Sequence, residues 1–145
     1  MPEQFDLENF LPYRLSLLSN RVSEAIADSY RQTHNISMSE WRLILILGQY
    51  PNSTATELIE YTAMDKVRVS RAVKRLIEKQ LISAKNHASD GRSRSLSLTD
   101  NGKKLRADVI PKARDCETEL HKVLSVDEVK VFSQLVDKLL LATAN

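Results

Sequence analysis

The stretches MDKVRVSRAVKRLIEK (residues 64–79) and DGRSRSLSLTDNG (residues 90–102) decide the fold of this 145-residue chain. In the first stretch, Asp65 is a typical N-cap, and we expect a helix from Lys66 to about Lys79. A helical wheel divides this helix into two faces. The apolar face comprises Val69, Ala72, Val73, Leu76 and Ile77, and the opposite face comprises Val67, Ser70, Arg71, Lys74 and Arg75. One side is suited to packing on a core, and the other to meeting a partner.

A β-hairpin is expected after this helix. The sequence predicts two short strands, at residues 81–85 and 93–98. In the second strand Leu96 and Leu98 alternate with serines, so we expect the leucines to point inward and the serines outward. The polar segment between the strands contains Asp90-Gly91, a typical hairpin turn.

Before the basic helix, the sequence predicts three helices. Apolar spacing predicts a long helix over residues 8–33, with Pro12 tolerated in its first turn. Ser39 is expected to cap a second helix over residues 40–48, which is apolar nearly all round and therefore central to the core. A capping box at Thr54-Ala-Thr-Glu57 begins a short third helix.

Two further helices are expected at the carboxyl end. Thr99 is expected to cap a long helix that passes or kinks at Pro111 and continues to about Leu124. Ser125 is expected to cap the last helix, which carries a long apolar stripe. The fold class is therefore mainly α with a small two- to three-stranded β-wing: a winged helix-turn-helix with long N- and C-terminal helices.

The net charge of +2 hides an uneven distribution. Residues 66–94 hold nine basic and two acidic side chains, a formal charge of +7, while the other residues hold 12 basic and 17 acidic side chains, a charge of −5. A solvated helix surface normally interleaves acids with its bases at i,i+4 spacing, and here such acids are nearly absent. This concentration of cations favours a polyanionic partner such as nucleic acid.

Composition excludes several other classes of protein. A hydrophobic content of 42% and a charged content of 28% are typical of a globular chain, and one Cys cannot form an intrachain disulfide. No apolar run approaches a membrane span, and the first residues lack the features of a signal peptide, so we expect a cytoplasmic protein with no membrane partner. We find no nucleotide loop, nucleophile elbow or metal spacing, and expect no enzyme activity, cofactor or metal.

The order of elements gives each basic residue a chemical role on DNA. A helix with one packed face can enter the major groove, where Arg binds guanine bidentately and Ser accepts several partners. Arg92 and Arg94 at the edge of the hairpin are placed to reach a minor groove. Phosphate contacts, which position without specifying, suit Lys66, Arg68, Lys79 and Lys85.

These residues resemble the MarR family of bacterial transcription regulators. The resemblance rests on Trp41 in SEWRL, on the basic helix, and on the wing pattern D-x-R-x-x-x-L-x-L-T-x-x-G from Asp90 to Gly102. It covers the whole chain and departs from the family at Gln80, where a Gly usually ends the helix. We therefore expect a left-handed conformation or another cap at this position.

The resemblance implies a homodimer that binds a pseudo-palindromic double-stranded operator and acts as a repressor. It places the DNA-binding domain at residues 36–102 and the dimerisation helices at residues 1–35 and 103–145. The residues expected to contact DNA are Thr54, Lys66, Val67, Arg68, Ser70, Arg71, Lys74, Arg75, Lys85, Arg92 and Arg94. The residues expected at the dimer interface are Leu11, Leu120, Val123, Leu124, Phe132, Leu135 and Leu139.

The resemblance also implies a pocket for an effector, which is a small aromatic acid, a phenolic compound or an aromatic coenzyme A thioester that releases the DNA. Residues 11–23 look similar to members linked to aromatic-acid catabolism. The candidate ligand-binding residues are Tyr13, Arg14, Arg21 and Trp41, although exposed arginines and a core Trp are the simpler interpretation.

Simpler interpretations remain open for other features. Cys116 is expected to be a packing residue rather than an oxidant sensor, and Glu117 with His121 to be a solvated helix pair rather than metal ligands. A different class of function is a dimeric adaptor whose basic face binds an acidic protein. A palindromic preference on double-stranded DNA, with ordered salt dependence, would separate the two functions.

Overall fold

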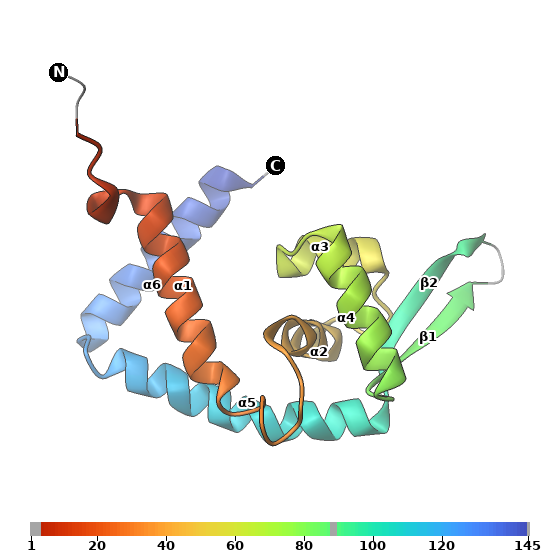
Figure 1. Cartoon of the computed structure of the whole chain (residues 1–145). Coiled ribbons are helices and arrows are strands. Elements are labelled where there is room, and N and C mark those ends of the chain that lie inside the picture. Colours follow the sequence, from red (N-terminus) through yellow and green to blue (C-terminus); the bar gives the residue numbers. More distant parts are fainter. Residues whose placement is uncertain (1–3, 88–89, 145) are drawn as a thin grey trace.

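A computed structural model describes residues 4–87 and 90–144, except for the side chains of residues 87–93. A 3-10 turn, η1 (Leu7–Asn9), precedes six α-helices and one hairpin (Figure 1). The elements follow in the order α1 (Leu11–Ala27), α2 (Met38–Gln49), α3 (Ala55–Thr62), α4 (Lys66–Glu78), β1 (Ile82–His87), β2 (Asp90–Leu98), α5 (Asp100–His121) and α6 (Val126–Thr143). The fold is thus mainly α with a β-wing, as expected.

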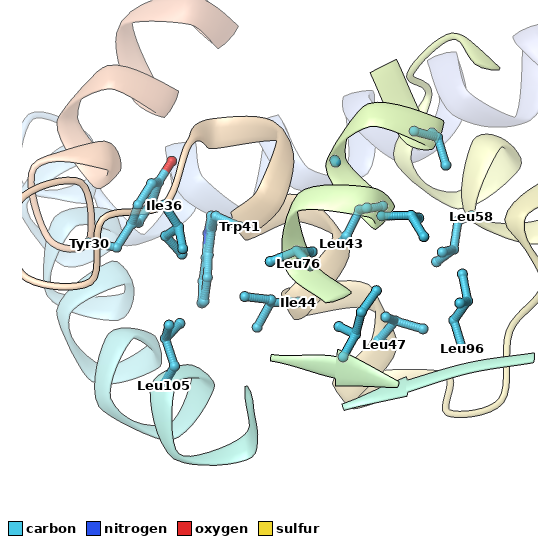
Figure 2. Packing of buried hydrophobic residues seen from close by; sticks show 14 of the residues in the cluster. Tyr30, Ile36, Trp41, Leu43, Ile44, Leu47, Leu58, Leu76, Leu96 and Leu105 are labelled. Carbon is cyan, nitrogen blue, oxygen red and sulfur yellow. The ribbon is translucent and has the colours of Figure 1, made fainter. Parts of the chain in front are cut away.

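Helix α2 is the centre of the core, as its apolar sequence predicted. It packs against α3, α4, α5 and β2, and its residues Trp41, Leu43, Ile44 and Leu47 are buried. Figure 2 shows these side chains meeting buried residues from the surrounding elements. The Trp41 ring stacks on Tyr30 with the ring centroids 5.5 Å apart. Such pairs add about 1 kcal/mol to the free energy of unfolding beyond their area burial.

The connection between α1 and α2 differs from the sequence prediction. Helix α1 ends at Ala27 instead of continuing to residue 33, although Tyr30 remains buried in the turns that follow. Ser37 caps α2 where Ser39 was expected, because the Ser37 side chain accepts a hydrogen bond from the Glu40 main-chain N–H. The apolar periodicity continued past the helix end because a core position does not require helical backbone.

His34 joins this connection to α5. Its Nε2 lies 2.6 Å from Asp108 Oδ2, and Lys112 Nζ lies 3.2 Å from the same oxygen. The hydrogen bond from His34, followed by the hydrogen bond and the charge of Lys112, lowers the pKa of Asp108 below its ordinary value of 3.8. The carboxylate therefore links two elements that are 74 residues apart in the sequence.

The hairpin is longer than predicted, and its turn lies elsewhere. Strand β1 pairs with β2 in one antiparallel register from Ile82–Leu98 to Asn86–Arg94, and the register shifts before the pair His87–Asp90. Asp90 and Gly91 therefore belong to β2, and the expectation that they form the turn is wrong. The antiparallel sheet has two strands, and one isolated bridge between Ser53 and Leu96 extends it.

The prediction of which β2 side chains point inward is correct for the two leucines and wrong for Ser95. Leu96 is buried and Leu98 packs against the core, as predicted. Ser95 is buried rather than outward, and the Ser97 hydroxyl donates to Asn52 Oδ1 at 2.9 Å. The Ser95 hydroxyl donates to the Lys85 carbonyl of β1, and the Ser53–Leu96 bridge brings Asn52 beside Ser97.

The two C-terminal helices begin where the sequence predicted. Thr99 accepts the Gly102 N–H, and Ser125 forms a capping box with Glu128. Helix α5 passes Pro111 without a break but ends at His121, three residues before the expected end. No residue of α6 is buried, and no helix within the described residues is long and apolar enough to cross a membrane.

Candidate nucleic-acid interface

The exposed face of α4 carries the side chains that the helical wheel placed there. Ser70, Arg71, Lys74 and Arg75 are exposed, and Val67 exposes 57% of its surface. On the opposite side, the apolar residues from Val69 to Leu76 are buried under α2 and α3. This packing fixes which side of α4 faces outward. The exposed surface of α4 therefore presents three cations, the Ser70 hydroxyl and the two methyl groups of Val67.

The first turn of α4 adds two further cations. Asp65 Oδ1 accepts the Arg68 main-chain N–H at 2.8 Å and so caps the helix. Lys66 and Arg68 are both exposed at this end. A helix N-terminus with free side-chain cations is suited to phosphate, because the helix dipole and the cations attract anions together.

A hollow of about 670 Å³ lies between the start of α3, the exposed side of α4 and β2. Thr54, Ser70, Lys74 and Arg94 all line it. Thr54 is held there by the predicted capping box, in which it accepts the Glu57 N–H at 3.2 Å. The structure thus brings together side chains from three elements that the sequence assigned to one interface.

The hairpin contributes one exposed cation from each strand. Lys85 of β1 pairs with Ser95 of β2, and Arg94 pairs with Asn86. Lys85 and Arg94 are exposed. Arg92 lies in β2, but its side chain is outside the described residues. The expected role of Arg92 therefore stays a prediction.

Lys79 forms hydrogen bonds within the chain. Its ammonium donates to Glu40 Oε2 and to the Asn35 carbonyl, each at 2.7 Å. These internal hydrogen bonds compete with the phosphate contact that the sequence analysis assigned to Lys79. Glu40, which accepts from it, was not singled out from the sequence.

An apolar cavity of about 780 Å³ lies among α1, α2, α5 and α6. Most of its lining is aliphatic or aromatic and includes Trp41, Ile110 and Phe132. Its polar lining comprises Arg106, Arg114, Glu117 and His121. Apolar walls with a few charged groups are typical of sites for small amphipathic molecules.

The expected ligand residues do not all meet in this cavity. Trp41 lines it, whereas Tyr13, Arg14 and Arg21 line a second hollow of about 650 Å³ between α1 and Phe132 of α6. Arg106 and Arg114, which line the apolar cavity, were not predicted from the sequence. Gly48 is the sequence feature that relates to Arg106. A Cβ at residue 48 would lie 2.0 Å from Arg106 Nε, so glycine at this position leaves room for the guanidinium.

Apolar side chains also gather on the terminal helices. Leu11, Leu120, Val123, Leu124, Phe132, Leu135 and Leu139, the expected interface residues, all lie exposed in the single chain. Four of them (Leu120, Val123, Leu124 and Phe132) also line the apolar cavity. Figure 1 shows α1 and α6 at the opposite end of the molecule from the hairpin. Exposed apolar surface on this scale marks an interaction site.

Comparison with known proteins gives matches centred on the middle of the chain. A model described as the MarR family matches residues 34–93. An uncharacterized HTH-type transcriptional regulator of Staphylococcus aureus is 29% identical over 80 residues, which are 55% of either chain. The chain thus matches about half the length of this curated relative.

Solved structures match over nearly the whole chain. A MarR/EmrR family transcriptional regulator from Acinetobacter is 27% identical with a TM-score of 0.83, covering 93% of this chain and 95% of that one. A mutant Escherichia coli MarR complexed with operator DNA has 19% identity and a TM-score of 0.84, with 96% and 99% covered. Bordetella bronchiseptica BpsR, described as regulated in DNA binding by 6-hydroxynicotinic acid, has 18% identity and a TM-score of 0.73, with 87% and 98% covered.

Proposed function

Because this chain belongs to the MarR family of transcriptional regulators, we propose that it binds double-stranded operator DNA as a homodimer and represses transcription until a small aromatic ligand releases it. As a DNA-binding regulator it acts in the bacterial cytoplasm. Residues 36–102 bind DNA in this proposal, and residues 1–35 and 103–145 form the dimer.

The exposed face of α4 carries the proposal. Arg71, Lys74 and Arg75 project from one side of a helix whose other side is packed, so this side is free to enter a major groove. Thr54 and Arg94 line the same hollow as Ser70 and are placed to contact the DNA phosphates beside that groove. The E. coli structure with operator DNA, which has the same fold, supports this arrangement.

The exposed apolar surface of the terminal helices supports the proposed homodimer. Helix α6 buries none of its residues within one chain, although its stripe includes Phe132, Leu135 and Leu139. Packing against a second copy of this chain is the simplest way to bury this stripe, because a two-fold interface presents the same patch from both subunits. Two copies of α4 would then read two half-sites, which fits a pseudo-palindromic operator.

The effector is proposed to occupy the apolar cavity beside Trp41. An aromatic ring would bury its faces against the apolar walls, and Arg106 or Arg114 would pair with a carboxylate. BpsR, whose ligand is named as 6-hydroxynicotinic acid, supports this class of compound. An aromatic acid, a phenol and a coenzyme A thioester remain the three chemical forms to test.

DNA binding is tested by selecting duplexes from a random library with the purified protein. The proposal predicts enrichment of an inverted repeat whose half-sites are about 10 base pairs apart. Affinity for the selected duplex should fall linearly on logarithmic axes as salt rises. A protein that enriches no sequence but binds a polyacidic peptide would instead be the adaptor.

Ligand control is tested by thermal unfolding with benzoate, hydroxybenzoates, hydroxycinnamates and their coenzyme A thioesters. A ligand at 100 times its Kd should stabilise the protein by about 2.7 kcal/mol and raise Tm by several degrees. The same compound should release the selected duplex. Arg114→Gln should weaken the response to carboxylates, whereas Arg21→Gln, in the second hollow, should not. Unchanged Tm with every compound would contradict ligand control.

A further inference from the structure

Glu40 is the only charged residue that is buried within the described part of the chain. Its side chain, in the first turn of α2, is 3% exposed. A buried carboxylate is unfavourable unless both of its oxygens have partners, and a well-packed apolar residue often stabilises such a position equally well. Core packing alone therefore does not account for an ionised group here.

Both oxygens of Glu40 have partners, and two of these partners come from one end of α4. Lys79 Nζ donates to Oε2 at 2.7 Å, Ser37 Oγ donates to Oε1 at 3.1 Å, and Arg75 Nη1 lies 4.0 Å from Oε1. Lys79 is the C-cap of α4 and Arg75 lies in its last turn. No buried side-chain polar atom in the described residues lacks a hydrogen-bond partner.

Lys79 extends the same link to the backbone before α2. Its ammonium also donates to the carbonyl of Asn35, which has a left-handed φ of 52°. The C-terminal end of α4 is therefore held at two points, by the Glu40 carboxylate and by the Asn35 carbonyl. Charge-assisted hydrogen bonds of this kind are directional, in contrast to apolar packing.

This pairing adds a directional link to the apolar packing of α4. The buried residues of α4 oppose apolar neighbours, and such contacts are non-directional. The Glu40–Lys79 pair adds a directional contact at the C-terminal end. The proximity of Arg75 to the same carboxylate also restricts its guanidinium, whose side chain is half exposed. Bidentate contacts to base edges depend on such positioning.

Resting on the proposed DNA-binding function, we propose that Glu40 is a positioning residue for sequence recognition: through Lys79 and Arg75 it sets the orientation of α4 that distinguishes operator from other DNA. Glu40 itself does not touch DNA. Its carboxylate acts only through the two cations that it holds.

The test compares Glu40→Gln with wild type on two probes: the duplex selected by wild type and a random-sequence duplex of equal length at the same salt. Glu40→Gln keeps the shape and removes the charge. It should weaken binding to the selected duplex at least tenfold and change binding to the random duplex less than twofold. Glu24→Gln is the matched control, since it removes the same charge from an exposed ion pair with Arg31 and should leave the ratio of the two affinities unchanged.

A second variant separates positioning from folding. Lys79→Gln, at a side chain that is one-third exposed, should lower the same ratio even where Glu40→Gln fails to fold. In the double variant the loss of discrimination should not exceed that of the larger single loss, because both changes break one link.

Several outcomes would overturn the positioning role. These are an unchanged affinity ratio in folded Glu40→Gln or Lys79→Gln, equal losses on both duplexes, or additive losses of discrimination in the double variant. A wild-type protein that enriches no duplex would instead contradict the proposed function, and the positioning role with it.

Discussion

The hydroxyl of Thr99 donates a hydrogen bond of 2.7 Å to the main-chain carbonyl of Gln80, which joins the end of α4 to the cap of α5. Gln80 has a φ of 61°, which is the left-handed one of the two alternatives expected at this position. Its N–H donates to Ile77, and the Leu81 N–H donates to Leu76 at 2.9 Å, which together form a Schellman motif. The chain enters the hairpin from this junction.

Gln80→Gly should stabilise the protein. A non-glycine residue in the left-handed region costs about 1–2 kcal/mol, and the extra flexibility of glycine in the unfolded chain offsets about half of that. The expected gain in the free energy of unfolding is therefore about 0.5–1 kcal/mol, measured by urea denaturation. A loss of stability would show that the Gln80 side chain makes a contact more valuable than the relieved strain.

Gly102→Ala should destabilise the same junction. A Cβ at residue 102 would lie 2.1 Å from the carbonyl oxygen of Leu81, and this backbone atom is fixed by the hairpin. Overpacking of this kind costs about 1–3 kcal/mol. Gly48→Ala is the comparison, since its Cβ would meet the flexible Arg106 side chain and Ala favours helix by up to about 1 kcal/mol. Urea denaturation giving equal losses for the two variants would refute this distinction.

The features that the sequence predicted correctly are local ones. Asp65, Thr99 and Ser125 cap helices as predicted because a cap depends on a few neighbouring residues. The two faces of α4 were predicted because a period of 3.6 residues determines them. At Gln80, where the chain departs from the family pattern, a left-handed conformation was one of two expected alternatives, and the structure has it.

What the sequence did not predict depends on contacts between distant residues. The end of α1 was misplaced because Tyr30 continues the apolar stripe while stacking on Trp41 from outside the helix. The turn of the hairpin is a local exception: it was misplaced because β2 extends back to Asp90, which pairs with His87. In the candidate site, Glu40 and Arg106 were missed because charged helix residues show no burial in a sequence.

Asp108→Asn should remove a pH-dependent part of the stability. The folded-state pKa of Asp108 is lowered by His34 and Lys112, so its contribution is present above the unfolded pKa of about 4 and is lost as pH falls through the lower folded pKa. The urea midpoint of wild type should exceed that of the variant at pH 6, and the difference should shrink below about pH 4. A difference that widened with acidification would contradict the assigned sign.

Leu135→Glu should dissociate the proposed dimer. Leu135 is half exposed on α6 and makes little contact within one chain, so the change should not lower the stability of a folded monomer by more than about 0.5 kcal/mol. Sedimentation velocity should show a dimer for wild type and a shift toward monomer for the variant. Glu119→Gln, on the exposed surface of α5, is the control. A monomeric wild type would contradict the interface.

The most direct test of base recognition by α4 is a mobility-shift titration of Arg71→Ala and Lys66→Ala on single-base variants of the selected duplex, repeated over a series of salt concentrations. Both side chains are exposed on α4, but they lie at different places along it. Arg71→Ala should lose discrimination at one or two base positions, worth about 1–3 kcal/mol, whereas Lys66→Ala should weaken all duplexes alike and reduce the salt slope by about one. Equal, sequence-independent losses for both variants would contradict the account.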